Sequence, residues 1–279
     1  MRRFFIFLFF LSFAFGKDLI LVSIFPFYDV VRDISGADFR IDTLVPPKAD
    51  YHTYELSPRE LIKLYIAKVF FVSGVPLGEW EAKAAKITKA KVFSLSEGIE
   101  LLHYGHRELG KDPHFWISPK RMLKVAQNVK KALESVYPNK DFGNNYKAVY
   151  EKLLNLHENY KKTLSRCKIK VFGAVHPAFG YLAKDYGLTQ IILREEHGHG
   201  GISPGELKKL IRKVRKRKIK VILIPQGAHS KIADILKEKY KVKVYEINVK
   251  IIPKENENNY YKIMENNLKT LRKALQCGY

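Results

Sequence analysis

The sequence has few of the residues from which many metal and redox sites are built. Of its 279 residues only two are Cys, three are Met and two are Trp. The two thiols, Cys167 and Cys277, are too few and too far apart to form a cysteine-based zinc site. After the first 16 residues the chain also lacks an apolar run near the roughly 20 residues that a membrane-spanning helix needs. A Cys-based zinc module is therefore excluded, and that part of the chain offers no candidate membrane span.

The two thiols allow a single disulfide. In an oxidising compartment two Cys often pair, and a bond between Cys167 and Cys277 would close a loop of more than a hundred residues. The alternative is two unrelated buried thiols, because the sequence alone does not bring their Cα atoms within bonding range. Both interpretations stay open at this point.

The first residues have the features of a secretory signal peptide. Two arginines follow Met1, an apolar run covers residues 4–15, and Ala14 and Gly16 provide small side chains at positions −3 and −1 of a cleavage site. The run is about a dozen residues long, shorter than a membrane span, so we expect cleavage and not an uncleaved anchor. No Cys lies in or just after the run, which argues against a lipoprotein. We expect residues 1–16 to be removed and the mature protein to be soluble, monomeric and periplasmic.

Acidic residues are scarce relative to basic ones. The 28 Asp and Glu face 50 Lys and Arg, which gives a formal net charge of +22, and the densest basic run covers residues 208–220. Within that run Leu210, Ile211 and Val214 recur at helical spacing, as on the buried face of a helix whose other face is solvated. We therefore expect a lysine-rich solvated surface and no nucleic-acid partner. Attraction to anionic lipid headgroups, as a peripheral membrane contact, or to the outer face of a transporter is the alternative.

Short apolar runs alternate with amphipathic stretches along the chain, which is typical of an α/β protein with parallel sheets. Ser-Pro pairs at 57, 118 and 203 predict helix starts, and further helices are expected before Gly36, at 178–186 and at 259–275. The predicted strands are residues 19–24, 39–45, 69–72, 91–93, 171–175, 190–193, 221–224 and 243–247.

One long helix is predicted in the middle of the chain. Residues 144–166 contain neither Gly nor Pro, and a helix there would be roughly 35 Å long at about 1.5 Å per residue. We interpret it as a spine between two lobes. The expected fold is thus α/β with two lobes, each a mostly parallel β-sheet flanked by helices, joined by a single long spine helix. The boundaries are residues 17–140 for the first lobe, 141–168 for the connecting spine helix and 169–279 for the second lobe.

Three of the nine His residues lie where α/β proteins bind ligands. His52 follows a predicted strand and precedes a capped helix, His114 lies just before another helix start, and His176 directly follows the strand 171–175. Because ligands of open α/β sheets bind beyond the carboxyl ends of the strands, these three side chains are expected to converge between the lobes. Imidazole nitrogen suits Zn²⁺, Cu²⁺ and Ni²⁺, whereas carboxylate and water suit Mn²⁺ and Mg²⁺. Three neutral imidazoles leave one position of a tetrahedral site for a fourth group.

Several linked motifs occur in order along nearly the whole mature chain. They are Phe27-Tyr28-Asp29-Val30-Val31, Ala49-Asp50-Tyr51-His52-Thr53-Tyr54-Glu55, Val72-Ser73-Gly74 with Glu79-Trp80, Asp112-Pro113-His114-Phe115-Trp116, His176-Pro177-Ala178-Phe179-Gly180-Tyr181, Tyr186-Gly187-Leu188, Pro225-Gln226 and Tyr261-x-x-x-Glu265-x-Asn267-Leu268. With these motifs the chain resembles the periplasmic metal-binding receptors of ABC metal uptake systems, of the ZnuA/TroA type.

The resemblance implies a solute-binding protein and not an enzyme. It implies that His52, His114 and His176 hold a metal ion between two lobes, and that an ABC transporter permease receives the ion. In this family the third metal ligand along the chain is His in zinc receptors and Glu in manganese receptors. The His176 of this sequence therefore implies Zn²⁺ as the bound substrate. Manganese or another divalent metal is the alternative within the family, and Cu²⁺ would also bind imidazoles tightly.

Two positions depart from the family pattern. The fourth ligand of the family, an Asp after the last strand, falls on Asn248, and a Glu before Pro-Gln falls on Ile224. A neutral amide is a poorer ligand than a carboxylate, and the Ile removes a hydrogen-bond acceptor that would support a ligand. Water, a flanking His, Glu246 or Asn248 itself are the candidates for the fourth ligand.

A short loop carries two further histidines. His197 and His199 lie among glycines and acidic residues, and His103 and His106 lie where zinc-type members of the family have a longer His-rich loop. A secondary, metal-collecting role for His197 and His199 is one hypothesis, and solvent-exposed loop histidines are the alternative. His157 and His229 are expected to be structural or exposed.

A zinc enzyme and a surface adhesin are the two alternatives to a metal receptor. A zinc enzyme also uses three His and a water, but the sequence has no His-Glu-x-x-His motif that would supply a general base. A surface adhesin is the third class, because members of the family have been proposed in such roles. The lack of a lipid-anchoring Cys argues against an adhesin.

Overall fold

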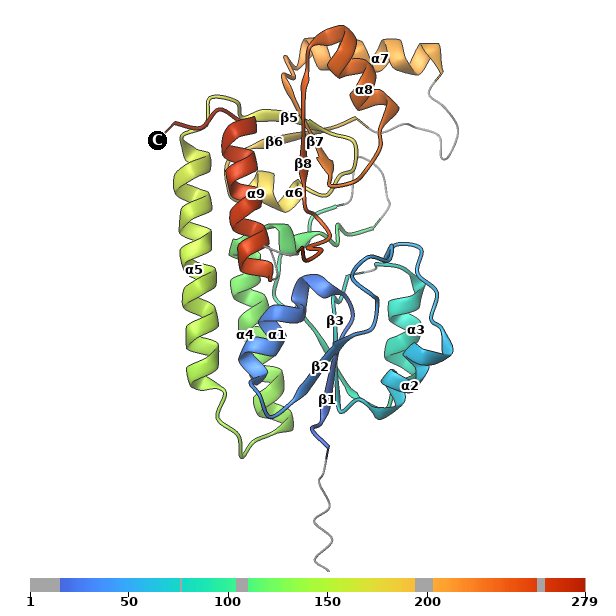
Figure 1. The fold of residues 1–279 in the computed structure, drawn as a ribbon, viewed down its shortest axis with the longest axis vertical. Coiled ribbons are helices and arrows are strands. Elements are labelled where there is room, and N and C mark those ends of the chain that lie inside the picture. Colours follow the sequence, from blue (N-terminus) through green and yellow to red (C-terminus); the bar gives the residue numbers. More distant parts are fainter. Residues whose placement is uncertain (1–15, 76, 104–109, 194–202, 255–258, 279) are drawn as a thin grey trace, which may run out of the picture.

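The computed structural model describes residues 16–75, 77–103, 110–193, 203–254 and 259–278 (Figure 1). The predicted signal peptide, apart from Gly16, lies outside the described residues, and so do His106, His197 and His199. In the part of the chain that is described, no helix combines the length and hydrophobicity required to cross a bilayer.

Two parallel sheets of four strands form the centres of two lobes, as predicted (Figure 1). The strand orders are β2-β1-β3-β4 and β6-β5-β7-β8, and all of the pairings are parallel. The central strands are buried on both faces, which explains why they appear in the sequence as uninterrupted apolar runs. The strands are β1 Leu19–Val22, β2 Arg40–Thr43, β3 Val69–Val72, β4 Lys91–Ser94, β5 Val171–Ala174, β6 Thr189–Ile192, β7 Val221–Pro225 and β8 Lys243–Ile247.

Helices flank both sheets. They are α1 Tyr28–Ser35, α2 Pro58–Ile66, α3 Glu79–Ile87, α4 Pro119–Val136, α5 Gly143–Ser165, α6 Gly180–Asp185, α7 Pro204–Lys216, α8 Lys231–Tyr240 and α9 Tyr260–Ala274, with short 3₁₀ turns at Phe25–Phe27 and Phe115–Ile117. At the predicted Ser-Pro starts, Ser57 and Ser203 form capping boxes with Glu60 and Glu206. The helices α3 and α8 were not predicted from the sequence.

The long helix α5 runs beside both lobes (Figure 1). It packs against α4, α1 and α9, and its buried face carries Val149, Leu153, Leu156 and Leu164 at helical spacing. One continuous apolar cluster extends from β1 in the first lobe through α5 to α9 in the second. This shared core confirms the two-lobe α/β fold and limits how far one lobe can move on the other. The lobe boundaries at residues 140 and 169 remain predictions.

The two Cys form a disulfide. Cys167, just after α5, is bonded to Cys277 near the end of the chain, 110 positions later. The backbones of the two residues also form an antiparallel bridge. The pairing hypothesis is therefore confirmed, and the bond fastens the end of α5 to the segment after α9.

Candidate metal centre

His52 lies in a loop that is fixed to the beginning of α3. Asp50 Oδ1 accepts a hydrogen bond from the His52 backbone N–H at 3.0 Å. Trp80 Nε1 donates to the carbonyl of Tyr51 at 2.6 Å. A Cβ atom at Gly78 would lie 3.2 Å from the His52 carbonyl oxygen and 2.8 Å from the Trp80 ring, so only Gly allows this close approach. These contacts hold the loop at the carboxyl edge of the first sheet.

His114 is fully buried, and its ring is oriented by a carboxylate. Asp112 Oδ1 accepts from the His114 backbone N–H at 2.9 Å and lies 2.8 Å from the ring atom Nδ1. If Nδ1 carries the proton, Nε2 presents its lone pair on the side of His176. The second lobe supports this loop, because the Tyr181 hydroxyl donates to the Asp112 carbonyl at 2.7 Å. Residues of both lobes thus set the position of His114.

His176 lies two residues after Ala174, the last residue of β5, and belongs to the second lobe. Its carbonyl accepts from the Ala178 N–H at 2.8 Å, and the next turn is held by Gln190, whose side-chain oxygen accepts from the Phe179 N–H at 2.9 Å. The strand end therefore directs this imidazole toward the first lobe.

The three predicted histidines converge. One ligand nitrogen from each of His52, His114 and His176 can be chosen so that all lie within 4.8 Å of one another. The Nε2 atoms of His114 and His176 are 3.3 Å apart, and the ring centroids are separated by 5.0 to 5.7 Å. Among the described residues this is the one group of three or more His, Cys, Asp or Glu with spacing suited to a metal ion.

The surroundings of His52 favour the neutral ring that a metal requires. Burial, with a smaller contribution from the charge of neighbouring His114, lowers the pKa of His52 from 6.5 to about 4. Its Nε2 atom is buried and has no hydrogen-bond partner among the described residues. A buried nitrogen with a free lone pair is costly unless something binds it. The trio therefore fits an imidazole-binding cation such as Zn²⁺.

Two side chains considered as a fourth ligand, Asn248 and Glu246, are both engaged in other hydrogen bonds. Asn248 uses both side-chain polar atoms in a turn, since Oδ1 accepts from the Ile252 N–H at 3.0 Å and Nδ2 donates to the Ile252 carbonyl at 2.8 Å. Glu246 is exposed, and its carboxylate accepts from the Gly227 N–H. Ile224 is buried in the apolar cluster beneath α7 and α8.

The other predicted histidines lie away from the trio or outside the described residues. His157 Nδ1 is 3.0 Å from the Tyr186 hydroxyl, and His229 is exposed, as expected for structural or surface residues. His103 is exposed and lies 3.4 Å from the ammonium of Lys111. The loop with His197 and His199 is not described.

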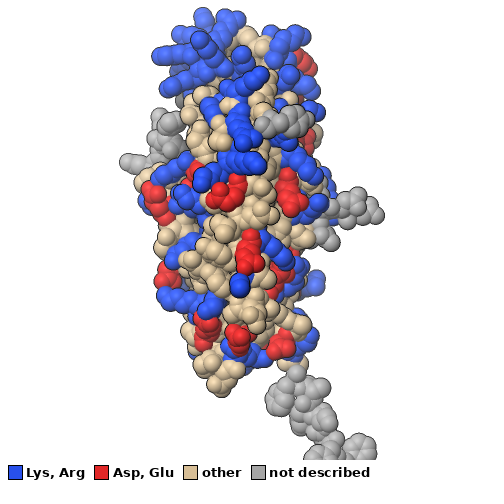
Figure 2. Space-filling model, turned by 90° about the vertical axis from the view of Figure 1, so that its left-hand side faces the viewer, with Lys and Arg blue, Asp and Glu red and all other residues tan. Residues whose placement is uncertain are grey.

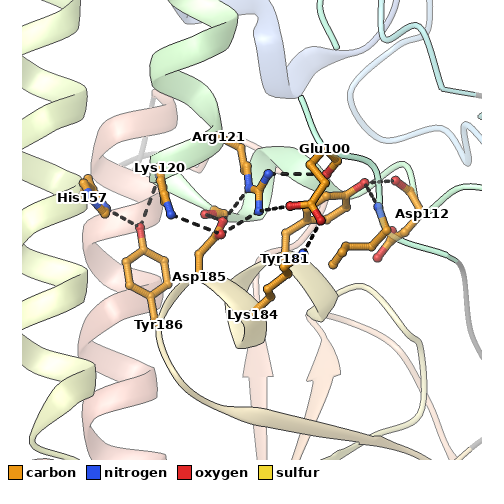
Figure 3. A network of polar contacts seen from close by, with 11 residues as sticks. Glu100, Asp112, Lys120, Arg121, His157, Tyr181, Lys184, Asp185 and Tyr186 are labelled. Carbon is orange, nitrogen blue, oxygen red and sulfur yellow. Dashed lines mark hydrogen bonds and ion pairs between the residues drawn. The ribbon is translucent and has the colours of Figure 1, made fainter. Parts of the chain in front are cut away.

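A polar network that the sequence analysis missed joins the lobes beside the site (Figure 3). The carboxylate of Asp185, at the end of α6, accepts two hydrogen bonds from the Arg121 guanidinium, both at 2.8 Å, and one from the Ser118 hydroxyl at 2.7 Å. Lys184 forms an ion pair with Glu100 at 2.6 Å in the same network. No local pattern in the sequence reveals such a network, because its partners lie more than 60 positions apart.

Comparison with known proteins assigns the chain to one group. The sequence profile described as "Zinc-uptake complex component A periplasmic" matches residues 20–274. The zinc-binding lipoprotein AdcA of Streptococcus pneumoniae is 30% identical over 280 residues, which cover 93% of this chain and 56% of AdcA. This chain therefore spans about half the length of that relative. The high-affinity zinc uptake system protein ZnuA of Bacillus subtilis is 28% identical over 283 residues, covering 92% of this chain and 87% of ZnuA.

Solved structures have the same fold. The Zn(II)-bound ZnuA-like domain of S. pneumoniae AdcA superposes with a TM-score of 0.80 at 30% identity, covering 93% of this chain and 99% of that domain. A laminin-binding adhesin of Streptococcus agalactiae superposes with a TM-score of 0.81 at 25% identity, covering 93% of this chain and all of the adhesin structure.

Proposed function

The chain belongs to the family of periplasmic zinc-uptake component A, and from this membership we propose that it is an extracytoplasmic receptor that captures Zn²⁺ between two lobes and delivers it to an ABC transporter permease. The observation that carries the proposal is the convergence of His52, His114 and His176. Two of these side chains come from the first lobe and one from the second, so bound zinc would tie the lobes together.

The chemistry of the three donors favours zinc over manganese. Imidazoles are preferred by Zn²⁺, whereas Mn²⁺ is better served by carboxylates, and the trio contains none. The Asp112 carboxylate lies next to Nδ1 of His114, on the other side of the ring from Nε2. It makes Nε2 a stronger electron-pair donor to a metal ion. A manganese receptor of the same fold is the second candidate, and it would need carboxylate ligands that the trio lacks.

We propose water as the fourth ligand. Asn248 could reach a metal only by giving up its two hydrogen bonds with Ile252. Three neutral imidazoles and a water leave the bound ion with its full charge of +2, and Lys250 adds a further positive charge near His52. A carboxylate at position 248 should therefore strengthen binding.

A binding role is proposed over a catalytic one. The relatives described above are named for zinc binding and zinc uptake. Glu55, a carboxylate close to His52 in the sequence that could be considered as a general base, is exposed in the loop after His52. The adhesin among the structural neighbours is similar in fold, but the convergence of the three histidines supports zinc capture directly, and the described residues show no comparable feature that supports adhesion.

Release of zinc would involve the loops that carry the histidines more than a large rotation of the lobes. The continuous core through α5 and the Arg121–Asp185 contact oppose such a rotation. The loop of His52 is joined to α3 through the hydrogen bond from Trp80 Nε1 to the Tyr51 carbonyl, so this loop can rearrange while the lobes keep their positions.

The test is metal binding by the mature protein. We expect one Zn²⁺ per chain, displaced poorly by Mn²⁺ in competition titrations with a chelating indicator. Substitution of His52, His114 and His176 by Ala should abolish binding, whereas His157→Ala and His229→Ala should leave it intact. Absence of zinc binding, or full binding by the triple variant, would overturn the proposal. Asn248→Asp should tighten zinc binding.

The cellular setting is proposed from the leader and from the family. We propose cleavage after Gly16 and a soluble, monomeric periplasmic protein, with a secondary metal-collecting role for His197 and His199. Mass spectrometry of the exported protein tests the cleavage. A His197→Ala/His199→Ala variant should slow zinc uptake from dilute solution while leaving the affinity of the main site unchanged.

A further inference from the structure

The outer end of the second lobe carries an unusual concentration of positive charge. Residues 203–243, which include α7 and α8, contain 14 Lys and Arg against three Asp and Glu, a net charge of +11, or half the net charge of the whole chain. Figure 2 shows basic side chains gathered at this end of the molecule. The basic end consists of 14 side chains, all of them exposed: Lys208, Lys209, Arg212, Lys213, Arg215, Lys216, Arg217, Lys218, Lys220, Lys231, Lys237, Lys239, Lys241 and Lys243.

The fold holds these charges outward. Leu210 and Val214 on the opposite face of α7 are buried in an apolar cluster with Ile232 and Leu236 of α8. The guanidinium of Arg215 lies 5.4 Å from the centre of the Tyr240 ring, which joins the last turn of α7 to the end of α8. The basic end is thus a firm surface, about 20 Å long along α7 at about 1.5 Å per residue.

Nearby acidic side chains do not neutralise this surface. Between described residues no ion pair includes any member of the basic end, whereas lysines of the first lobe pair with acidic neighbours, as Lys63 does with Asp42 and Lys140 with Asp38. Lys213 Nζ donates a hydrogen bond to the Ile192 carbonyl at 2.9 Å, which leaves its charge in place. In the part of the chain with defined positions, the charges of the basic end are therefore not neutralised and remain available to an external partner.

In the turns after α7 and α8, a lysine adopts a backbone conformation that Gly or Asn would adopt with less strain. Lys218 after α7 and Lys241 after α8 have φ angles of 49° and 54°. This left-handed conformation favours Gly or Asn at helix ends. Both positions extend the basic end instead.

We propose that the basic end binds the anionic surface of a lipid bilayer. A broad, firm array of Lys and Arg that form no ion pair with described residues can contact many headgroups at once, and clusters of four to eight Lys and Arg are typical of segments that bind anionic membranes. The contact would keep the receptor near membrane transporters. Its biological setting rests on the proposed extracytoplasmic function, but the binding itself does not involve the histidines.

Vesicle binding tests this proposal on the mature full-length chain. We expect sedimentation with phosphatidylcholine vesicles that contain 30% phosphatidylglycerol, no sedimentation with pure phosphatidylcholine vesicles, and strong weakening at 0.5 M salt. A variant of the basic end with five changes should bind at least tenfold more weakly: Lys208→Gln, Lys209→Gln, Arg212→Gln, Lys216→Gln and Arg217→Gln.

A matched control removes the same charge from the first lobe. Its five exposed positions are Lys68→Gln, Lys83→Gln, Lys86→Gln, Lys89→Gln and Lys91→Gln. We expect less than a threefold loss of vesicle binding in the control. No binding of the unaltered protein to anionic vesicles, or equal losses in the two variants, would overturn the proposal, and so would binding to a soluble polyanion such as polyphosphate without binding to vesicles. Both variants should keep their zinc affinity, so this test and that of the zinc receptor can fail separately.

Discussion

Asp112 determines which nitrogen of His114 can face the other two histidines. Its carboxylate lies 2.8 Å from Nδ1, while Nε2 lies 3.3 Å from the Nε2 atom of His176. A carboxylate behind a ligating imidazole fixes the orientation of the ring and raises its basicity. The Asp112 side chain is therefore part of the proposed zinc site without being a ligand.

Asp112→Asn should weaken zinc binding by about 10- to 100-fold. An amide carries no negative charge that attracts the bound cation through the ring, and it holds the His114 tautomer with a proton on Nδ1 less firmly than a carboxylate does. Competition with a chelator of known affinity measures the change. Asp38→Asn, which alters an exposed carboxylate on the first lobe, should have no effect. Equal zinc affinity of the Asp112→Asn variant and the unaltered protein would contradict this role.

His52 should make the stability of the metal-free protein depend on pH. Its pKa is about 4 in the folded chain against 6.5 for the free side chain, because burial disfavours the charged ring. Between these values the unfolded chain binds a proton that the folded chain does not. The free energy of unfolding should therefore be highest above pH 6.5 and should fall as the pH drops toward 4.

Denaturant unfolding at pH 7, 5.5 and 4.5 measures this dependence. A His52→Gln variant, which does not titrate in this range, should lose less stability over the same interval. Identical slopes for the two proteins would show that His52 does not contribute.

At the scale of elements, α4 and α6 are locked together by one buried carboxylate. The Asp185 side chain is 2% exposed and bridges the Arg121 guanidinium and the Ser118 hydroxyl at the first turn of α4. A carboxylate at this helix start is also favoured by the helix dipole. The contact sets the distance between the lobe of His114 and the lobe of His176.

Asp185→Ala should lower the free energy of unfolding by about 3 kcal/mol, because the mostly buried Arg121 side chain would lose its closest ionic partner and keep only the longer contacts with Glu100. Removing both side chains should cost less than the sum of the single changes, so a double-mutant cycle with Arg121→Ala should give a clear coupling energy. Zinc affinity should fall as well, since the lobes are less firmly held. Additive effects of the two substitutions would contradict the lock.

At the scale of the whole molecule, the disulfide closes most of the second lobe into a loop. Cys167 and Cys277 are 110 positions apart, and cross-linking a loop of this length restricts the unfolded chain strongly. Because the bond lies at the end of α5, away from the region between the lobes (Figure 1), it should affect stability and not the zinc site.

A Cys167→Ser/Cys277→Ser variant should be less stable by about 3–5 kcal/mol on the loop-entropy argument. Denaturant unfolding of this variant, and of the unaltered protein with and without a reductant, measures the loss. Zinc affinity should remain within about threefold. A large loss of zinc binding with little loss of stability would show that the bond organises the site instead.

The sequence alone was sufficient for the parts of this protein that follow from local patterns. The predicted strands overlap all eight strands of the described residues, Ser-Pro pairs marked three helix starts, and the absence of Gly and Pro marked α5. It missed α3 and α8, because neither begins with a Ser-Pro pair or is followed by a Gly: Thr88 follows α3 and Lys241 follows α8. His52, His114 and His176 were found because each follows a strand or precedes a helix start, and the family motifs supported the choice.

Only the tertiary structure decided what depends on contacts between distant residues. It brought the three imidazoles together from two lobes, paired Cys167 with Cys277, and placed Asp185 against Arg121. It also engaged the amide of Asn248 with Ile252. The physical reason is that periodicity and capping act over a few residues, whereas burial, hydrogen bonding and pKa at the site depend on which distant segments meet.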